Sequence, residues 1–485
     1  MSDATSGLKP EGVWKYFVEV SEIPRCSGNE KRVSDYVVET ATKLGLDAKQ
    51  DRQLNVVVTK PAAIGRESAP SVCLQGHLDM VCEKNKGVEH DFESDPIELV
   101  REGNVLTANG TTLGADNGIA VATHLALMED DSLAHGPLEF LFTVDEETGL
   151  TGAGQLKPGF VESRILLNLD SEDEGVLFVG CAGGRDTVGR WKLEMTRAPS
   201  GALPMLLRVE GLVGGHSGLE IDKQRGNSIK ILARALDALA NLGVRLGRME
   251  GGNKRNAIPR EAEALVFVPE AVARKAKSLV RNTEASIREE LAAVDPDVTV
   301  TLERAGEAGG RKALRKDDQA LVIRTLRGLP HGVIKMSEDI PGLVETSTNV
   351  AVIRSGNGEL VLETSQRSSV KSEIEEIAGS VSAIMELGGA SVEAAGGYPG
   401  WKPNMESRVL EIARSTYREL FGKAPEVTAV HAGLECGIIG ERYPGMDMVS
   451  FGPTLRGVHS PDEKILIDTV ERFWDYLCGI LQRIG

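Results

Sequence analysis

The sequence predicts an α/β protein in which a mostly parallel sheet, with helices on both faces, is interrupted by an inserted α+β domain. In residues 11–182, short and nearly continuous apolar runs alternate with amphipathic stretches, as expected for strands buried on both faces of a parallel sheet. After the glycine-rich segment 181–185 the helices become charged and exposed, and near residue 398 the first pattern returns. We therefore expect one α/β domain in two segments around an insertion. The predicted limits are 1–183, 184–398 and 399–485.

The first and last segments supply the elements of the parallel sheet. Three short apolar runs predict buried strands: 71–75, 138–144 and 165–169. Residues 118–128, between the first two strands, have the apolar spacing of a helix. In the last segment, an apolar strand over 448–451 precedes a loop rich in Gly, Pro and His, and an apolar helix over 469–484 ends the chain.

The inserted block mixes strands with amphipathic helices. Its predicted helices cover 228–242, 271–294 and 372–387. Its predicted single strands cover 264–268 and 298–302. Two further strands, 350–354 and 359–363, flank Ser-Gly-Asn-Gly and predict a hairpin. This order of elements is typical of an α+β domain.

Charge and cysteine content restrict the class of protein. The formal net charge is −17, so the protein's field repels nucleic acids and anionic membranes, and we expect neither as a partner. No apolar run approaches the ~18 residues of a transmembrane helix, and the first residues lack the pattern of a secretory signal. The six cysteines are scattered without a Cys-x-x-Cys pair, so we expect reduced thiols in a cytoplasmic protein.

Acidic and imidazole side chains follow several of the predicted strands. His77 and Asp79 follow the strand over 71–75, and two residues apart at a strand end they can point the same way. A carboxylate so placed can fix the imidazole tautomer while the other ring nitrogen binds a metal. Asp170 ends the strand over 165–169, and His459 lies in the loop after the strand over 448–451. Four other histidines match no ligand pattern, and we interpret them as surface or core residues: His90, His124, His135 and His331.

Three more carboxylates fit this pattern but also have simpler explanations. Asp116 directly precedes the helix over 118–128, where an Asp is also a common N-cap. Glu146 and Glu147 follow the strand over 138–144, and they also fit solvated loop residues or acids in a helix's first turn. In a metal site, adjacent carboxylates can divide the work, one as ligand and one as general base.

Taken together, these residues predict a metal site. The carboxyl ends of parallel strands meet in one crevice, where open α/β sheets bind ligands. Two imidazoles and three carboxylates, without a thiolate, suit Zn²⁺ and also Mn²⁺ or Co²⁺. Two such ions bridged by one carboxylate, ~3.5–4 Å apart, would polarise a carbonyl and generate hydroxide near neutral pH. Amide hydrolysis is the chemistry that needs both.

The order of these motifs resembles the M20 family of co-catalytic zinc peptidases. The shared motifs are HLD, DNG, DEETG, a strand ending in LD, and a late VHSPDE. Longer segments, including QGHLDMVCEKN, GTTLGADNGIA, GGHSG, NAIPRE and HAGLECG, are most similar to the aminoacyl-histidine (cytosolic non-specific) dipeptidase branch. The resemblance runs in order over nearly the whole chain.

The resemblance implies two zinc ions per chain, with Mn²⁺ or Co²⁺ as possible substitutes. His77 and Asp170 would hold one ion, Glu147 and His459 the other, and Asp116 would bridge them.

The resemblance also implies roles for two carboxylates outside the ligand set. Glu146 would be the general base, taking a proton from the metal-bound water and passing it to the leaving amine. Asp79 would orient His77. In the family the peptide bond after the bridging Asp is often cis, which here is the bond from Asp116 to Asn117.

The inserted block corresponds to the family's lid and dimerisation domain, and the resemblance implies four substrate-facing residues. His216, in GGHSG, would stabilise the transition-state oxyanion, although by itself it also fits a turn between glycines. Asn256 matches a position that contacts substrate, and Gly433 one where backbone amides approach it. Arg367 is our candidate receptor for the substrate carboxylate, because many relatives carry an Arg in the strand soon after NxIP, and the corresponding strand here, ALVFVP, has none. An exposed strand arginine is the alternative. His431 and Glu435 also fit scaffold residues of a turn.

The ligand set and the family resemblance together imply a cytoplasmic, metal-dependent dipeptidase that cleaves unblocked L-dipeptides, including Xaa-His such as β-alanyl-histidine. A deacylase of N-acyl amino acids and a catalytically inactive peptide-binding relative are the alternatives. Glu146 argues against the last, because a binding site needs no general base. The resemblance further implies a homodimer formed through the inserted domain.

Overall fold

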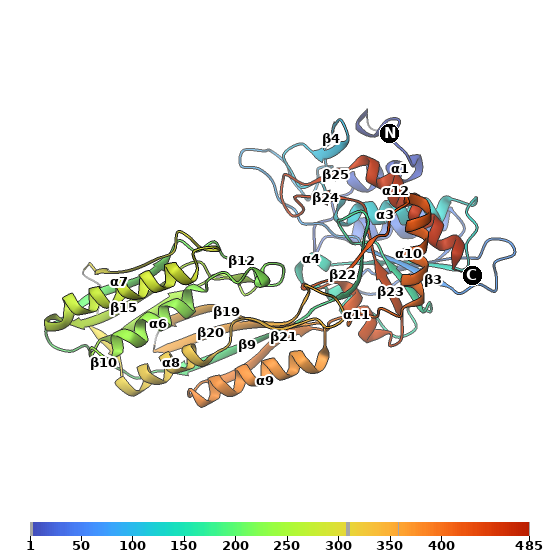
Figure 1. The fold of residues 1–485 in the computed structure, drawn as a ribbon. Coiled ribbons are helices and arrows are strands. Elements are labelled where there is room, and N and C mark those ends of the chain that lie inside the picture. The colour runs from blue at the N-terminus through green and yellow to red at the C-terminus, as the bar shows by residue number, and fades with distance from the viewer. Residues whose placement is uncertain (1–2, 307–310, 357, 485) are drawn as a thin grey trace. The chain divides into compact units, whose positions relative to one another are not determined.

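The computed structural model describes residues 3–306, 311–356 and 358–484, and the chain divides into two compact units (Figure 1). The first unit contains Met1–Cys181, Trp401–Ala429 and Leu434–Gly485. The second contains Ala182–Gly400 and Val430–Gly433. In the described part of the chain, we find no helix with the length and apolar character needed to cross a bilayer.

An eight-stranded sheet forms the centre of the first unit, in the order β1-β2-β6-β3-β7-β23-β8-β22. Its strands are β1 Asp47–Gln50, β2 Val56–Lys60, β3 Val72–His77, β6 Leu138–Thr143, β7 Ile165–Asn168, β8 Val176–Cys181, β22 Glu426–Val430 and β23 Asp447–Ser450. β3 pairs in parallel with β6 and β7, and β7 pairs in parallel with β23. The pairs β1–β2, β2–β6 and β8–β23 are antiparallel. The α/β class is confirmed, with a parallel centre and antiparallel flanks.

Helices of the first unit pack against this sheet or against one another. They are α1 Glu11–Ser21, α2 Lys31–Lys43, α3 Ala115–Glu129, α4 Glu146–Gly149, α5 Thr151–Gly154, α10 Arg408–Phe421, α11 Glu435–Arg442 and α12 Ile467–Arg483. α3 packs between α1 and β3 and is buried along almost its whole length, because apolar residues occupy every face. Asp116 and Asn117 have non-helical backbone angles, so regular helix begins at Gly118, as the sequence predicts.

A small sheet beside the main one, in the order β24-β25-β5-β4, holds the loop that carries His459. Its strands are β4 Leu99–Glu102, β5 Val105–Ala108, β24 Leu455–Arg456 and β25 Lys464–Leu466. β24 and β25 pair directly, so the loop between them is fixed at both ends. His459 itself has φ 62°, in the left-handed region.

His124, on α3, is completely buried. Of the surface and core positions that the sequence left open for it, the structure shows the core position. Its ring meets Phe142 edge-on at 5.0 Å between centroids, and neither ring nitrogen has a hydrogen-bond partner among the described residues. Burial lowers the pKa of His124 to about 3.

We expect His124 to make the protein acid-sensitive. Below pH 6.5 the unfolded chain binds a proton at this imidazole that the folded chain excludes, so the free energy of unfolding falls as the pH falls. From pH 7 to pH 5 this one residue should lower it by about 2 kcal/mol. Urea unfolding of the wild type and His124→Leu at both pH values measures the difference. Equal pH slopes in the two proteins would contradict the prediction.

The second unit is built on a nine-stranded antiparallel sheet, in the order β16-β11-β15-β13-β19-β20-β9-β21, with β18 paired to β19. Its strands are β9 Gly183–Lys192, β11 Ala202–Glu210, β13 Arg245–Gly251, β15 Ala262–Pro269, β16 Thr299–Arg304, β18 Gly332–Met336, β19 Val344–Gly356, β20 Glu359–Ser368 and β21 Ser391–Tyr398. Two short pairs accompany it: β10 Met195–Arg197 with β17 Lys312–Leu314, and β12 Gly215–His216 with β14 Ala257–Ile258. The predicted hairpin is β19–β20; Asn357 of its turn lies outside the described residues.

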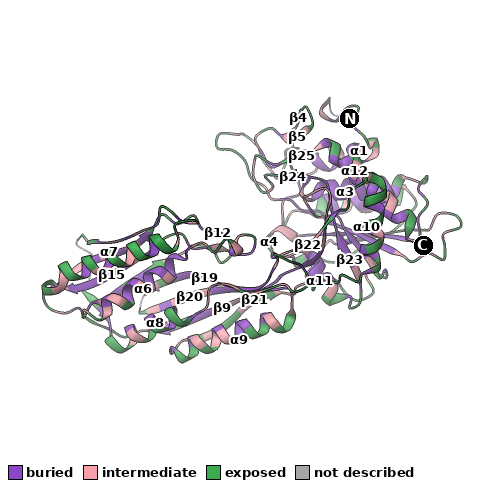
Figure 2. Cartoon of the chain, in the orientation of Figure 1, coloured by how far each residue is buried: buried purple, intermediate pink, exposed green. Residues whose placement is uncertain are grey.

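Four helices complete the second unit: α6 Ser228–Ala240, α7 Ala273–Glu290, α8 Lys316–Gly328 and α9 Lys371–Leu387. α6 packs on β11 and β15, and α9 packs on β9 and β20. The side chains between helices and sheet form one apolar core, and Figure 2 shows the remaining helix surfaces as intermediate or exposed. This unit therefore has the α+β organisation that the sequence predicts.

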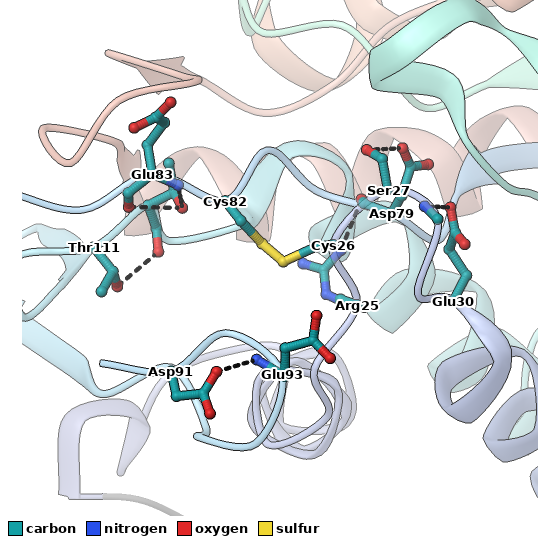
Figure 3. Close-up of a disulfide and its surroundings, with 12 residues drawn as sticks. Arg25, Cys26, Ser27, Glu30, Asp79, Cys82, Glu83, Asp91, Glu93 and Thr111 are labelled. Carbon is teal, nitrogen blue, oxygen red and sulfur yellow. Dashed lines mark hydrogen bonds between the residues drawn. A yellow bond between two sulfur atoms is a disulfide. The ribbon is translucent and has the colours of Figure 1, made fainter. Parts of the chain in front are cut away.

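The structure corrects the expectation of six reduced thiols. Cys26 and Cys82 form a disulfide, with 5.7 Å between their Cα atoms (Figure 3). The two segments meet because Cys26 lies in a β-bridge with Met80. The partners are 56 residues apart and in no spacing motif, which is why the sequence did not indicate the pairing. The other four cysteines are free: Cys73, Cys181, Cys436 and Cys478.

Candidate functional site

Three of the five predicted metal ligands, and the predicted base Glu146, lie where strands of the main sheet end. His77 is the last residue of β3, and Asp170 follows β7 by two residues. Glu146 and Glu147 follow β6 and open α4. Since β6, β3 and β7 are parallel neighbours, their carboxyl ends bring these side chains to one edge of the sheet.

A first group of ligand atoms surrounds His77, whose side chain is 1% exposed. Its Nε2 atom lies 3.1 Å from Asp116 Oδ1 and 3.3 Å from Asp170 Oδ1. These three residues each offer one nitrogen or oxygen atom within 4.8 Å of the others. The nitrogen and the two oxygens lie close enough together for a single cation to contact all three.

A second group surrounds His459. Its Nε2 atom lies 2.9 Å from Glu147 Oε2 and 3.1 Å from Asp116 Oδ2. Asp116 thus turns a different oxygen toward each imidazole, and it is common to both groups. Glu147 Oε1 is buried without a hydrogen-bond partner among the described residues, so an acceptor is left unused beside this group. Imidazole and carboxylate donors without thiolate fit Zn²⁺, Mn²⁺ or Co²⁺.

Asp79, which is completely buried, connects the strand end to α4. Its Oδ1 atom lies 3.3 Å from His77 Nδ1 and accepts a hydrogen bond from the Glu146 amide at 3.1 Å. Its Oδ2 atom accepts from the Glu147 amide at 3.2 Å and from the Ser27 hydroxyl at 2.8 Å. Burial raises the pKa of Asp79, but the hydrogen bonds, chiefly with His77, outweigh it and lower the pKa to about 2. Asp79 therefore holds both His77 and the start of α4.

The pKa values of several groups in this cluster are shifted, because buried carboxylates and imidazoles lie close together. Glu146 shares its surroundings with His77 and Glu147. Burial, with the charges of Asp170, Glu435 and Glu147, raises the pKa of Glu146 well above its ordinary value. Burial likewise raises the pKa of Asp170 to about 6. Hydrogen bonds with Asp116 and Glu147 raise the pKa of His459 to about 11. The shared cause of these shifts is the close approach of buried acidic and imidazole side chains.

Asn117 is a site residue whose role the sequence did not indicate. The peptide bond from Asp116 to Asn117 is cis, as the family resemblance implied. The Asn117 amide donates to the Leu169 carbonyl at 3.0 Å and accepts from the His77 amide at 3.2 Å, so it ties two strand ends together. A Cβ atom at Gly76 would lie 2.4 Å from Asn117 Oδ1, which explains the glycine before His77.

Glu435, interpreted as a possible scaffold residue, is completely buried in the first unit. It accepts hydrogen bonds from Gln75 Nε2 at 2.6 Å and Thr143 Oγ1 at 2.7 Å. Burial raises its pKa to about 7. Both donors lie on the central strands near their carboxyl ends, so Glu435 links β3, β6 and α11.

The four predicted substrate residues all lie in the second unit. His216 Nδ1 accepts hydrogen bonds from the Gly218 and Leu219 amides at 3.2 and 3.1 Å. A neutral imidazole that accepts at Nδ1 carries its proton on Nε2, which makes that atom a donor. β12 pairs with β14, and the Asn256 carbonyl accepts from the Ser217 amide at 2.8 Å. His216 and Asn256 are therefore neighbours.

Arg367 is 7% exposed, which excludes the alternative of an exposed strand arginine. Its Nη1 atom donates to the Tyr398 hydroxyl at 2.8 Å, and its Nε atom has no partner among the described residues. A Cβ atom at Gly433 would lie 2.7 Å from the Tyr398 ring, so this glycine packs directly on the tyrosine. His431 binds the Ser347 hydroxyl at 2.7 Å through Nε2. Arg367 and Gly433 thus meet at Tyr398.

Comparison with known proteins identifies the family. The sequence pattern of Peptidase family M20/M25/M40 matches residues 73–483. The chain belongs to this family. Membership of the M20 family makes it a metallopeptidase and implies that it binds divalent metal, consistent with the two groups of ligand atoms described above.

Relatives cover the whole chain. The sequence is 40% identical over 480 residues to the cytosol non-specific dipeptidase of Escherichia coli (strain K12), covering 99% of each protein. The crystal structure of aminoacylhistidine dipeptidase from Vibrio alginolyticus is 40% identical, with a TM-score of 0.93 over 100% of this chain and 98% of that one. Aminopeptidase PepT from Bacillus cereus ATCC 10987 is 15% identical with a TM-score of 0.56, covering 98% of this chain and 99% of that one, and shares the fold.

Proposed function

We propose that this protein is a metal-dependent dipeptidase that hydrolyses unblocked L-dipeptides, including Xaa-His substrates of the β-alanyl-histidine type. One observation carries the proposal. Two groups of ligand atoms share Asp116 and lie beside Glu146, in a chain that is 40% identical over its whole length to dipeptidases. A pair of cation sites next to an unligated carboxylate can polarise the amide carbonyl, activate the attacking water and accept its proton.

The proposed metal content is two Zn²⁺ ions per chain, with Mn²⁺ or Co²⁺ as substitutes. His77 and Asp170 would hold one ion, Glu147 and His459 would hold the other, and Asp116 would contribute to both. The unpartnered Glu147 oxygen and the donor chemistry support this assignment. When bound, the ions polarise the scissile carbonyl and lower the pKa of the attacking water.

Residues of the chain supply the proton transfers and hydrogen bonds. Glu146 takes a proton from the attacking water and delivers it to the leaving amine. Asp79 holds the Glu146 amide and the His77 ring, which keeps the general base beside the ligands. The Nε2–H group of His216 donates a hydrogen bond to the oxygen that becomes negative in the transition state. Its tautomer is set in advance by two backbone amides.

Arg367 is the proposed receptor for the substrate carboxylate, with Asn256 and the backbone at Gly433 as further substrate contacts. Replacing Arg367 with methionine should raise KM for dipeptides about 10–100-fold, because a hydrogen bond to a charged group contributes about 1.5–3 kcal/mol. The same measurement on a dipeptide amide, which has no carboxylate, should show little change. Arg354→Met, an exposed arginine on β19, is the control. An equal loss for acid and amide substrates would show that Arg367 does not bind the carboxylate.

We further propose that the protein is a cytoplasmic homodimer that pairs through residues 184–398. Large apolar side chains of this unit are exposed in the single chain, among them Val213, Leu219, Ile334 and Met336, which supports an interface there. Light scattering should give twice the 52.0 kDa chain mass. A 52.0 kDa species at working concentration would contradict the dimer.

The deciding experiment is peptide hydrolysis by metal-stripped protein reconstituted in parallel with Zn²⁺, Mn²⁺ and Co²⁺. The panel contains β-alanyl-histidine, several ordinary dipeptides, a tripeptide and an N-acetyl amino acid. We expect metal-dependent cleavage restricted to free dipeptides. Cleavage of the acylated compound alone would make the protein a deacylase, and absence of cleavage with every metal would make it a binding protein.

A further inference from the structure

Arg25 is a buried cation that holds two of the segments carrying proposed metal ligands. It lies between α1 and α2 and is 2% exposed. Its Nη1 atom donates to the carbonyls of Leu78 and Asp79, both at 2.9 Å, and its Nη2 atom donates to the Gly114 carbonyl. Figure 3 shows the guanidinium beside Asp79 and the disulfide of Cys26. Arg25 therefore connects the residues after His77 with those before Asp116.

Two glycines make room for this guanidinium. A Cβ atom at Gly114 or at Gly118 would lie 2.6 Å from Arg25 Nη2, closer than real Cβ contacts allow. Gly114 also has φ +67°, in the left-handed region that favours glycine. The backbone on both sides of Asp116 is thus shaped to receive Arg25.

Glu463 holds the same segment through its amides. Its Oε2 atom accepts from the amides of Leu113 and Gly114 at 2.8 and 2.9 Å, and its Oε1 atom accepts from Ala115 and Asp116 at 2.8 and 3.2 Å. Four consecutive amides are therefore bound by one carboxylate, which is 2% exposed.

Glu463 also belongs to the loop that carries His459. Glu463 lies four residues after His459, in the connection between β24 and β25, and its amide donates to the Ser460 carbonyl at 3.0 Å. Its backbone therefore belongs to the loop of one proposed ligand, while its side chain holds the segment of another. Gly114 is fixed at its amide by Glu463 and at its carbonyl by Arg25.

We infer that Arg25 and Glu463 are positioning residues that hold the segment 113–116 so that the two oxygens of Asp116 face the two imidazoles, and that they thereby set the affinity for metal. The inference rests on the proposed function for the presence of the ions. Neither residue offers an atom to the groups of ligand atoms, so both act through Asp116. Partners of this kind contribute about 10–100-fold to metal affinity.

Two other buried charges in the same unit provide matched controls, because they bind backbone groups away from the ligands. Lys60, 5% exposed, donates to the carbonyls of Leu127, Met128 and Asp130 at 2.7–3.1 Å. Glu139, 7% exposed, accepts from the amides of Glu162 and Ser163. Replacing either residue removes a buried charge and its hydrogen bonds but leaves the segments that carry the proposed ligands intact.

The test compares Glu463→Gln with Glu139→Gln, and Arg25→Met with Lys60→Met, using metal-stripped full-length protein and Co²⁺ alone. Affinity is measured by calorimetry and ligand geometry by the visible spectrum of bound Co²⁺. We expect Glu463→Gln to bind Co²⁺ about 10–100-fold more weakly with an altered spectrum, and Glu139→Gln to match the wild type in both. Arg25→Lys, which keeps the charge, should lose less affinity than Arg25→Met.

The outcomes separate this inference from the proposed function. Wild-type affinity and spectrum in both Glu463→Gln and Arg25→Met would overturn the positioning role, whatever the activity. If Glu463→Gln does not fold, Glu463→Asp and Arg25→Lys decide by the same two readouts. If the wild type binds Co²⁺ but cleaves no peptide, the proposed function fails and the comparison of affinities still decides the inference. A wild type that binds no Co²⁺ overturns both.

Discussion

Replacing Glu146 with glutamine should lower kcat for dipeptides by about 10²–10⁴-fold while leaving the metal content unchanged. The amide of glutamine cannot accept the proton of the attacking water, so the step that generates the nucleophile loses its base. The proposed metal ligands are five other residues, and the Glu146 contact that Asp79 accepts comes from the backbone amide, which the substitution keeps. Steady-state kinetics and elemental analysis of the same preparation measure both quantities.

Asp145→Asn is the matched control, because Asp145 precedes Glu146 directly and the proposal gives it no role in catalysis. Its side chain accepts from the hydroxyls of Thr148 and Thr151 within its own turn. This variant should keep kcat close to the wild-type value. Undiminished turnover in Glu146→Gln would remove the general base from the proposed mechanism, whereas loss of metal along with activity would make Glu146 a ligand.

Features that depend on short spacing were predictable from the sequence. His77 and Asp79 are two residues apart after an apolar strand, and the structure places the His77 ring against the Asp79 carboxylate. Glu146 and Glu147 follow the next strand of the parallel sheet, and their amides reach the same carboxylate. Parallel strands bring their carboxyl ends together by geometry alone, so apolar runs followed by polar residues were enough.

Contacts with backbone groups could not be predicted from the sequence: Glu463 ends the VHSPDE motif, but the motif does not indicate which groups its side chain binds. Glu463 binds the amides of residues 113–116, nearly 350 positions earlier, and any residue type could supply those amides. Arg25 binds carbonyls in the same way, and only Gly114 and Gly118, which make room for it, mark the site. The Cys26–Cys82 disulfide and the antiparallel flanks of the main sheet likewise require knowledge of which distant segments meet.

Replacing Asp116 with asparagine should disturb both proposed metal sites at once and lower activity by more than 100-fold, beyond the loss expected when a partner outside the ligand set is removed. The Asp116 oxygens lie 3.1 Å from His77 Nε2 and 3.1 Å from His459 Nε2. Asparagine offers one oxygen and one amide nitrogen, so at most one of the two sites keeps its oxygen donor. Metal content should fall from two ions per chain to one or fewer, as measured by elemental analysis after dialysis.

Single-site variants give the comparison that isolates the bridge. Asp170→Asn removes a donor from the His77 group, and His459→Gln removes one from the Glu147 group, so each should weaken one site and spare the other. If Asp116→Asn alone loses metal from both sites, the shared carboxylate explains that loss. If Asp116→Asn retained two ions and wild-type turnover, the two groups would have to be independent, and the short contacts of Asp116 would then reflect packing of a metal-free cluster rather than a bridge.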